Sequence, residues 1–336
     1  MSLQNKILAG CIALQAVILI IIFWPSSSGP NVEQLLSGIE ESQVMEMTLT
    51  DLAGTSIRLR RGPSGCVLPQ ADDYPCLEDK LTSFTSRLVD IDTASLIAQT
   101  PASHRRLKVA DDDFDRLIEL HLADGSSRRI YLGTSIRPQS LHARVENRDE
   151  VYFATGITTS DAWVQPTGWV EPNFFNLPQE QMVAFTQENA RGRIRLEKDE
   201  NGVWSLPEES PIRPISQDKV ETLVRKADSL RMLFPLGKEE LSSYGLQDPS
   251  AVVTIETFED GNSREYVLYV GSRDAEQEAY VVNTSESPYY FLIHQYYVQD
   301  FVHRVTESVL VDPPPTPTPE PSESEAQPVG APVTSP

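Results

Sequence analysis

The feature that most restricts the fold of this chain is an internal repeat. Leu132-Gly133-Thr134 reappears as Val270-Gly271-Ser272, 138 residues further along the chain. Other pairs recur at spacings of 136 to 139 residues: Tyr152-Phe153 with Tyr290-Phe291, Trp163 with Phe301, Lys80 with Lys219, and Asp124-Gly125 with Asp260-Gly261. A period this long is typical of tandem domains, because the units of a solenoid are far shorter. The sequence therefore predicts two copies of one domain.

Each copy predicts the same series of elements. Short strands come first, at 44–50, 57–60 and 65–68 in the first copy and at 182–186, 193–197 and 202–206 in the second. An amphipathic helix follows, because apolar side chains recur at helical spacing. These side chains are Leu77, Leu81, Phe84 and Leu88 in the first copy and Val220, Leu223, Val224, Ala227 and Leu230 in the second. Ser216 is the expected N-cap of the second helix.

Two hairpins complete each copy. The first hairpin of each copy turns at an Asp-Gly dipeptide, which favours a tight turn between two strands. Strands are expected at 117–122, 129–132, 143–145 and 151–154, and again at 251–257, 266–270, 280–283 and 289–293. Because strands and helices are grouped and do not strictly alternate, we expect an α+β fold of largely antiparallel sheet with one main helix per domain.

An uncharged apolar stretch, residues 7–24, precedes the repeats. At about 1.5 Å of rise per residue such a helix spans ~27 Å, close to the hydrocarbon thickness of a bilayer. Lys6 comes before it, and the next basic residue is Arg58. The positive-inside rule therefore places the short end in the cytoplasm and the body outside it. A cleaved signal peptide and a lipoprotein acylated at Cys11 are the alternatives.

These features divide the chain into six parts. We expect a cytoplasmic stub (1–6), a transmembrane helix (7–24), a linker (25–40), repeat domain 1 (41–176), repeat domain 2 (177–311) and a tail (312–336). The tail is rich in Pro, Ser, Thr and Glu and contains no aromatic residue, Lys or Arg, a composition typical of disorder. The expected location is a single-pass protein of the cell membrane, with its body on the extracytoplasmic side.

Charge and cysteine content restrict the partners and the compartment. The formal net charge of −21 argues against nucleic acid as a partner, because that affinity depends on Lys and Arg contacts with phosphates. Cys66 and Cys76 are the cysteines outside the apolar stretch, and export would permit a disulfide between them. In the repeat they fall at the positions of Trp204 and Ile215, so a contact between those residues would bring the cysteines together. Two buried free thiols are the alternative.

The second copy carries the run Leu241-Ser242-Ser243-Tyr244-Gly245-Leu246-Gln247-Asp248-Pro249, preceded by 201–206 and followed by Val270-Gly271. Together with residues 169–175 leading into 183–185, it resembles a bacterial domain-of-unknown-function family of membrane-anchored envelope proteins. The resemblance covers roughly residues 40–310. It implies tandem copies behind one helix and, for some members, genes beside gliding-motility-type ABC transporter subunits. The first copy departs from it, with Lys108-Val109-Ala110-Asp111 aligned to Tyr244-Gly245-Leu246-Gln247.

Residue patterns that carry chemistry are scarce. The five histidines, His104, His121, His142, His294 and His303, show no metal-ligand spacing. Asp111, Asp113 and Asp115 match the first spacings of a calcium loop, but Arg116 replaces its glycine and Leu122 its glutamate. No nucleophile elbow, phosphate-binding loop or dinucleotide motif occurs. We therefore expect no catalytic, metal or cofactor site, and no enzyme.

Four aromatic residues cluster where the copies meet: Trp163, Trp169, Phe174 and Phe175. They either form a ligand platform between the domains or seal the first copy against the second. The sequence thus predicts a non-catalytic accessory or scaffold protein that acts through protein contacts, and the resemblance implies an ABC-type transport complex as its partner. A binding or sensor module for an envelope polymer or small ligand is the alternative, and a hydrolase is a third interpretation.

Overall fold

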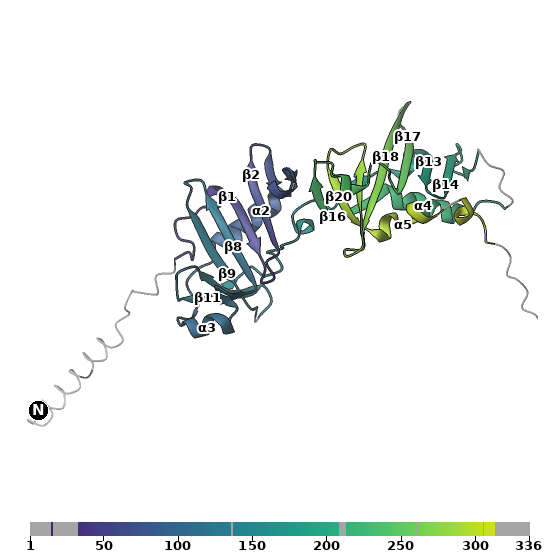
Figure 1. Ribbon diagram of the computed structural model, residues 1–336. Coiled ribbons are helices and arrows are strands. Elements are labelled where there is room, and N and C mark those ends of the chain that lie inside the picture. Colours follow the sequence, from purple (N-terminus) through teal and green to yellow (C-terminus); the bar gives the residue numbers. More distant parts are fainter. Residues whose placement is uncertain are drawn as a thin grey trace, which may run out of the picture.

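The computed structural model describes residue 15 and residues 33–135, 137–207, 213–259, 261–304 and 306–312. Two nine-stranded antiparallel sheets form two domains, each with its own helices (Figure 1). The predicted α+β class and tandem organisation are confirmed. The apolar stretch 7–24 apart from Gln15, the tail from 313 onward and the turn residue Asp260 lie outside the described residues. Within the described ranges, no helix combines the length and the apolar character needed to cross a bilayer.

The first sheet has the strand order β4-β3-β2-β1-β8-β9-β10-β11-β5. In that order its strands are Tyr74–Pro75, Gly65–Leu68, Ser56–Gly62, Val44–Thr50, Arg116–Leu122, Ser127–Leu132, Ser140–Val145, Val151–Thr155 and Leu96–Ala98. Two helices accompany it, α2 (Glu78–Val89) and α3 (Pro101–Arg106), with a small hairpin of β6 (Val109–Ala110) and β7 (Asp113–Phe114). The short helices η1 (Glu41–Gln43), η2 (Pro69–Ala71) and η3 (Pro166–Gly168) lie in its connections.

The second sheet has the order β12-β16-β20-β19-β18-β17-β13-β14-β15. In that order its strands are Asn173–Asn176, Ser229–Gly237, Tyr290–His294, Ala279–Thr284, Asn262–Asp274, Ala251–Glu259, Met182–Asn189, Gly192–Lys198 and Trp204–Ser205. The helices are α4 (Gln217–Asp228) and α5 (Gln295–His303), with short helices η4 (Gln179–Gln181), η5 (Ser242–Tyr244) and η6 (Thr306–Val309). Eight strands of the two sheets therefore correspond one to one. The order β3-β2-β1-β8-β9-β10-β11-β5 in the first sheet matches β15-β14-β13-β17-β18-β19-β20-β16 in the second.

The main helices of the two domains are equivalent residue by residue. The buried positions of α2 are Leu81, Phe84, Thr85, Leu88 and Val89, and those of α4 are Val220, Leu223, Val224, Ala227 and Asp228. Each position in the second list follows its counterpart by 139 residues. This is the spacing that aligns Lys80 with Lys219, so the helical part of the predicted repeat is confirmed. Leu77, expected on the buried face, lies just before α2 and is 41% exposed.

Strand pairing corrects one part of the repeat alignment. Ala143 pairs with Tyr152 in the first sheet, and the equivalent Val282 pairs with Phe291 in the second. The alignment of Tyr152 with Tyr290 is therefore wrong by one residue. The second domain contains one additional residue. It lies at the register shift between Val270 and Arg273 of β18, where the pairing of β18 with β19 is interrupted. A slip of one residue exchanges the two faces of a strand, so this correction decides which side chains are buried.

A close backbone approach explains the glycines of the repeat. A Cβ on Gly133 would lie 2.0 Å from the carbonyl oxygen of Leu107, and one on Gly271 would lie 2.1 Å from that of Tyr244. The residue after each carbonyl is left-handed, with φ of 57° at Lys108 and 66° at Gly245. Lys108 therefore corresponds to Gly245 and not to Tyr244, because each crossing loop must make the same turn.

The segment entering the first domain is held against it. Leu35, Leu36 and Ile39 are buried in its core, although the sequence placed them in the linker 25–40. Glu33 and Thr93 exchange backbone and hydroxyl hydrogen bonds of 2.9 to 3.1 Å. The apolar side chains draw this segment onto the domain, so the packed body begins at Glu33 among the residues described.

Candidate functional site at the domain junction

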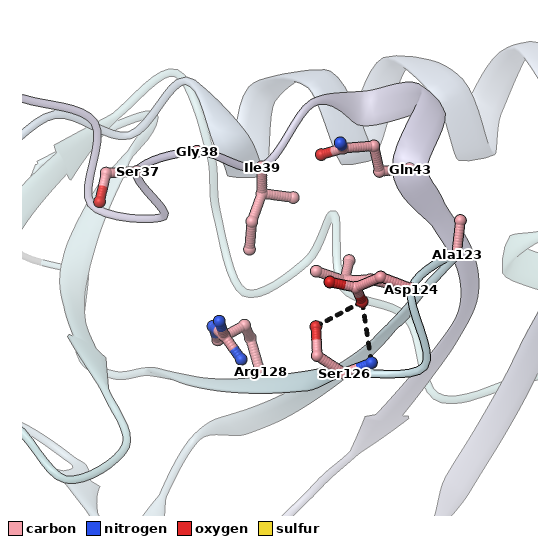
Figure 2. A pocket seen from close by; sticks show the side chains of 9 residues that line it. Ser37, Gly38, Ile39, Gln43, Ala123, Asp124, Ser126 and Arg128 are labelled. Carbon is pink, nitrogen blue, oxygen red and sulfur yellow. Dashed lines mark hydrogen bonds between the residues drawn. The ribbon is translucent and has the colours of Figure 1, made fainter.

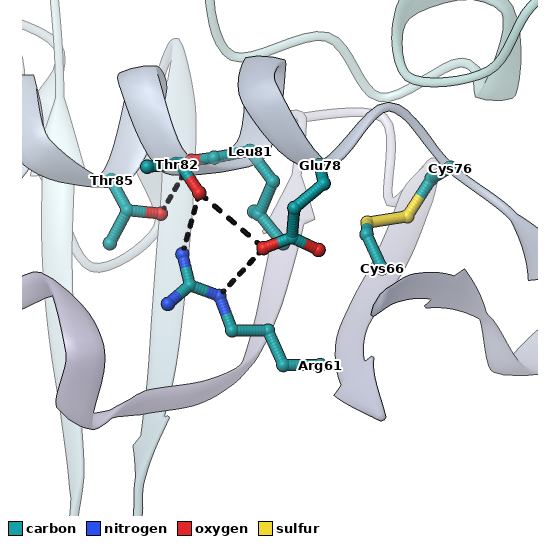
Figure 3. Close-up of a disulfide and its surroundings, with 7 residues drawn as sticks. All are labelled: Arg61, Cys66, Cys76, Glu78, Leu81, Thr82 and Thr85. Carbon is teal, nitrogen blue, oxygen red and sulfur yellow. Dashed lines mark hydrogen bonds and ion pairs between the residues drawn. A yellow bond between two sulfur atoms is a disulfide. The ribbon is translucent and has the colours of Figure 1, made fainter. Parts of the chain in front are cut away.

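The predicted disulfide joins Cys66 and Cys76 (Figure 3). Their Cα atoms are 5.0 Å apart, and the backbone N–H of Cys76 donates to the carbonyl of Cys66 at 2.9 Å. In the second domain the side chain of Gln217 makes the equivalent connection, since it accepts from the N–H of Trp204 and donates to its carbonyl, both at 2.9 Å. The disulfide in the first domain and the Gln217 hydrogen bonds in the second both connect the start of the main helix to the neighbouring strand.

An ion-pair cluster lies beside the bridge in the first domain (Figure 3). The guanidinium of Arg61 pairs with Glu41, lies 3.5 Å from Glu78 and donates to Thr82 at 3.2 Å. The side chain of Arg61 is only 18% exposed, so these contacts offset the cost of removing its charge from water. The cluster fixes η1 and α2 against β2.

The disulfide closes the loop that contacts the second domain. Asp72 and Asp73, between η2 and β4, are both left-handed, with φ of 51° and 59°. The carboxylate of Asp72 accepts from the backbone N–H of Lys238 at 2.6 Å. The hydroxyl of Tyr289 donates to the carbonyl of Asp73 at 3.1 Å and lies 3.4 Å from that of Asp72. This loop, residues 69–75, is called the docking loop below.

Aromatic side chains fill the junction behind these hydrogen bonds. The ring of Tyr74 meets Tyr289 edge-on at 4.8 Å between centroids and Phe291 at 5.9 Å. Phe174 stacks on Phe291 at 4.0 Å. Burial, reinforced by Tyr289 and Glu171, raises the pKa of Tyr74 to about 12. The buried apolar residues of both domains form one contiguous cluster, so the junction continues the packing of both interiors.

The four predicted aromatic residues separate into two groups. Trp169 is fully buried against Phe84 of α2, with ring centroids 5.5 Å apart, and its indole N–H donates to the carbonyl of Trp163 at 2.8 Å. Phe174 and Phe175 pack in the second domain, and Phe175 lies 6.3 Å from the ring of Tyr266. Trp163 is 47% exposed, whereas Phe301, aligned with it by sequence, is fully buried.

Two of the three acidic residues with calcium-like spacing pair with basic side chains. Asp111 pairs with the buried Arg144, and Asp113 lies 2.7 Å from the ammonium of Lys108. The hydrogen bond from Arg144 lowers the pKa of Asp111 more than partial burial raises it. Over the part of the chain that the structure describes, no three His, Cys, Asp or Glu side chains group so as to hold a metal ion.

Hydrogen bonds hold three of the predicted histidines in place. His104 is buried, with Nε2 2.9 Å from the carbonyl oxygen of Asp149. His142 is buried in β10 with Nδ1 3.0 Å from the hydroxyl of Thr134, and burial lowers its pKa. His294 is the N-cap of α5, where its Nδ1 accepts from the N–H of Tyr296 at 3.2 Å.

A cavity of about 400 Å³ lies between the segment 37–43 and the turn of the β8–β9 hairpin (Figure 2). Three of its polar side chains are engaged with one another or with the backbone: Asp124 accepts from the N–H and hydroxyl of Ser126, and Gln43 accepts from the N–H of Glu40. Figure 2 shows Asp124 and Ser126 turned toward one another. These bonds hold the hairpin turn and the segment 40–43, and they do not point these groups at a common reacting atom.

Apart from Phe174, the sequence did not identify the residues that join the domains. Asp73 and Tyr289 are 216 residues apart, and their contact depends on the orientation of two domains. The one local signal was the position of the docking loop between the two cysteines.

Comparison with protein families agrees with this architecture. A family described as a domain of unknown function, DUF4340, matches residues 67–233 and again 204–309. Neither curated proteins nor solved structures gave a match. The two family matches cover most of the body of the chain, in the order expected for tandem copies. The chain belongs to the DUF4340 family.

Proposed function

We propose that this chain is a non-catalytic accessory scaffold, anchored by residues 7–24 at the outer face of the cytoplasmic membrane. There it presents two rigidly joined domains to a partner protein complex of the ABC transporter type. The apolar stretch and its charge asymmetry support the location. The transporter as partner rests on the resemblance noted in the sequence, and the family itself supplies no activity.

The junction is the observation that carries the scaffold role. A disulfide-closed loop of the first domain accepts hydrogen bonds from Lys238 and Tyr289 of the second. Aromatic rings pack behind these bonds. Domains in one chain are expected to move relative to one another unless their interface is well packed and apolar. A well-packed, hydrogen-bonded junction of this kind is expected in a protein that holds two binding surfaces at a fixed distance from one another.

Copurification tests the partnership. The full chain is expressed from its own locus with an affinity tag, membranes are solubilised in a mild detergent, and copurifying proteins are identified by mass spectrometry. Subunits of one ABC-type complex should recover with the chain in near-constant ratio. The Gly271→Ala variant, in which the second domain is strained, should recover a smaller amount of the transporter subunits than the parent chain. The anchored protein eluting alone would contradict the partnership.

Protease treatment of intact spheroplasts tests the location separately. The proposal expects the body to be digested from outside while a fragment containing residues 1–24 stays in the membrane fraction. Protection of the body until the membrane is lysed would overturn it.

A further inference from the structure

A second cavity, about 320 Å³ in volume, lies in the second domain close to the junction. Phe234 and Leu236 of β16 line it together with Val281 and Leu292 of the neighbouring strands. Lys238, whose backbone N–H donates to the carboxylate of Asp72, lies two residues after Leu236. The cavity therefore borders the surface that the fixed junction holds in place.

The floor of this cavity is apolar and separate from the main core. Ala279, Val281 and Leu292 form their own buried cluster, and five further side chains pack on it while remaining partly exposed: Leu233, Phe234, Leu236, Tyr244 and Leu246. Apolar side chains gathered around an open cavity mark a surface that gains free energy when another protein covers it.

Acidic residues outnumber basic ones around the rim of the cavity. Asp274 lines the cavity, and Glu276 and Glu278 lie in the turn that follows Asp274. Burial and the nearby carboxylate of Glu239 raise the pKa of Tyr244, which also lines the cavity. The hydroxyl of Tyr290, whose ring lies 5.3 Å from that of Tyr244, is 3.5 Å from the carboxylate of Glu240.

Arg273 also lines the cavity, and Lys238 lies nearby in the chain. Arg273 donates to Gln295 at 2.9 Å, and the ammonium of Lys238 lies 4.7 Å above the ring of Tyr289. An acidic rim attracts a basic partner and repels an acidic one.

In the first domain, an arginine side chain covers the position that corresponds to Leu292 of the cavity. Phe153 pairs with His142 as Leu292 pairs with Val281, so Phe153 corresponds to Leu292. The guanidinium of Arg137 lies 5.6 Å above the ring of Phe153. The first domain therefore covers this position with an arginine of its own chain.

From these observations we propose that the cavity of the second domain binds a partner segment that inserts an apolar side chain and places flanking Arg or Lys residues on the acidic rim. This inference rests on the proposed scaffold function and names the chemistry of the contact. The apolar residue would cover Leu236 and Leu292. The inserted segment as a whole would occupy the place that Arg137 occupies in the first domain.

Peptide binding to the purified full chain in detergent tests the inference. The probes are a fluorescein-labelled pentapeptide of alternating arginine and leucine and its glutamate–leucine counterpart, measured by fluorescence anisotropy. The arginine peptide should bind, and the glutamate peptide should not. Leu236→Asp should weaken binding about tenfold or more, since a buried carboxylate replaces the apolar floor. The double variant Glu239→Gln/Glu240→Gln should weaken it severalfold and reduce its salt dependence.

Matched variants separate this site from general attraction to an acidic protein. Val203→Asp changes an exposed apolar residue just before β15, and Glu221→Gln/Glu265→Gln removes the same charge from exposed positions elsewhere. Both should leave binding unchanged. Absence of binding, or equal weakening by test and control variants, overturns the inference. Copurification with a transporter alongside failed peptide binding would reject this inference alone, whereas peptide binding without copurification would reject the proposed transporter partnership.

Discussion

The hydroxyl of Tyr289 in the second domain donates a hydrogen bond of 3.1 Å to the carbonyl oxygen of Asp73 in the first. Asp73 lies in the docking loop, which is enclosed between the two cysteines of the Cys66–Cys76 disulfide. The contact thus connects a covalent constraint in one domain to the orientation of the other.

Removing the disulfide should destabilise the first domain. For a sequence separation of 10 residues, loop closure predicts a loss of about 2–3 kcal/mol from the free energy of unfolding. The measurement is denaturant unfolding of the Cys66→Ser/Cys76→Ser variant against the oxidised parent. An unchanged midpoint would show that the bridge does not constrain the unfolded chain. The matched control is Cys11→Ser, which leaves the bridge in place.

A methyl group at the strand glycine of either domain should be poorly tolerated. Gly271→Ala places a Cβ 2.1 Å from the carbonyl oxygen of Tyr244, and relieving that overlap should cost about 1–3 kcal/mol of stability. Gly62→Ala is the control, because its Cβ would lie 3.6 Å from the nearest backbone oxygen, that of Gly65. Equal melting temperatures for the two variants would contradict the crossing-loop explanation.

Tyr289→Phe should loosen the junction without unfolding either domain. The variant loses the hydrogen bond to Asp73 but keeps the ring contact with Tyr74, so the expected loss is about 0.5–1.5 kcal/mol. Hydrogen exchange should report faster opening of the docking loop. Tyr296→Phe, at a tyrosine that is 58% exposed, is the control and should change neither quantity.

The junction should weaken in alkali. The pKa of Tyr74 is raised to about 12 by burial, with Tyr289 and Glu171 adding to it, above its ordinary value of about 10. The folded protein therefore holds this proton more tightly than the unfolded chain does. The stability that this difference in pKa contributes is present below pH ~10 and is lost as the pH rises toward 12.

Measuring the free energy of unfolding at pH 9 and at pH 11 checks that stability falls as the pH rises. The parent should lose more stability over that interval than Tyr74→Phe, which has no proton to release. Equal losses in the two proteins would mean that Tyr74 does not carry the dependence.

Much of the strand framework was predictable because it depends on local pattern. The expected strands at 44–50 and 65–68 coincide with β1 and β3, where alternating or short apolar runs end at turn residues. The face of α4 was predictable because helical spacing alone selects Val220, Leu223, Val224 and Ala227. The disulfide followed from aligning the cysteines with a pair of core positions.

What escaped prediction depends on tertiary context. Leu230 was assigned to the helix, but α4 ends at Asp228 and Leu230 is fully buried in β16. Residues 229–234 continue the apolar spacing of the helix without Gly or Pro, so periodicity could not separate the two elements at Asp228. The docking loop was missed for another reason, since its partners lie in a different domain and no short-range pattern encodes them.

The most direct test of the account is the distribution of distances between the domains in solution. Maleimide dyes are attached at Ser127→Cys and Ser263→Cys, both exposed positions, in a Cys11→Ser background, and single-molecule energy transfer is recorded for the oxidised chain. The account predicts one narrow distribution, which broadens when Cys66 and Cys76 are both replaced by serine. A broad distribution in the oxidised chain would contradict the claim that the disulfide-closed docking loop fixes the two domains.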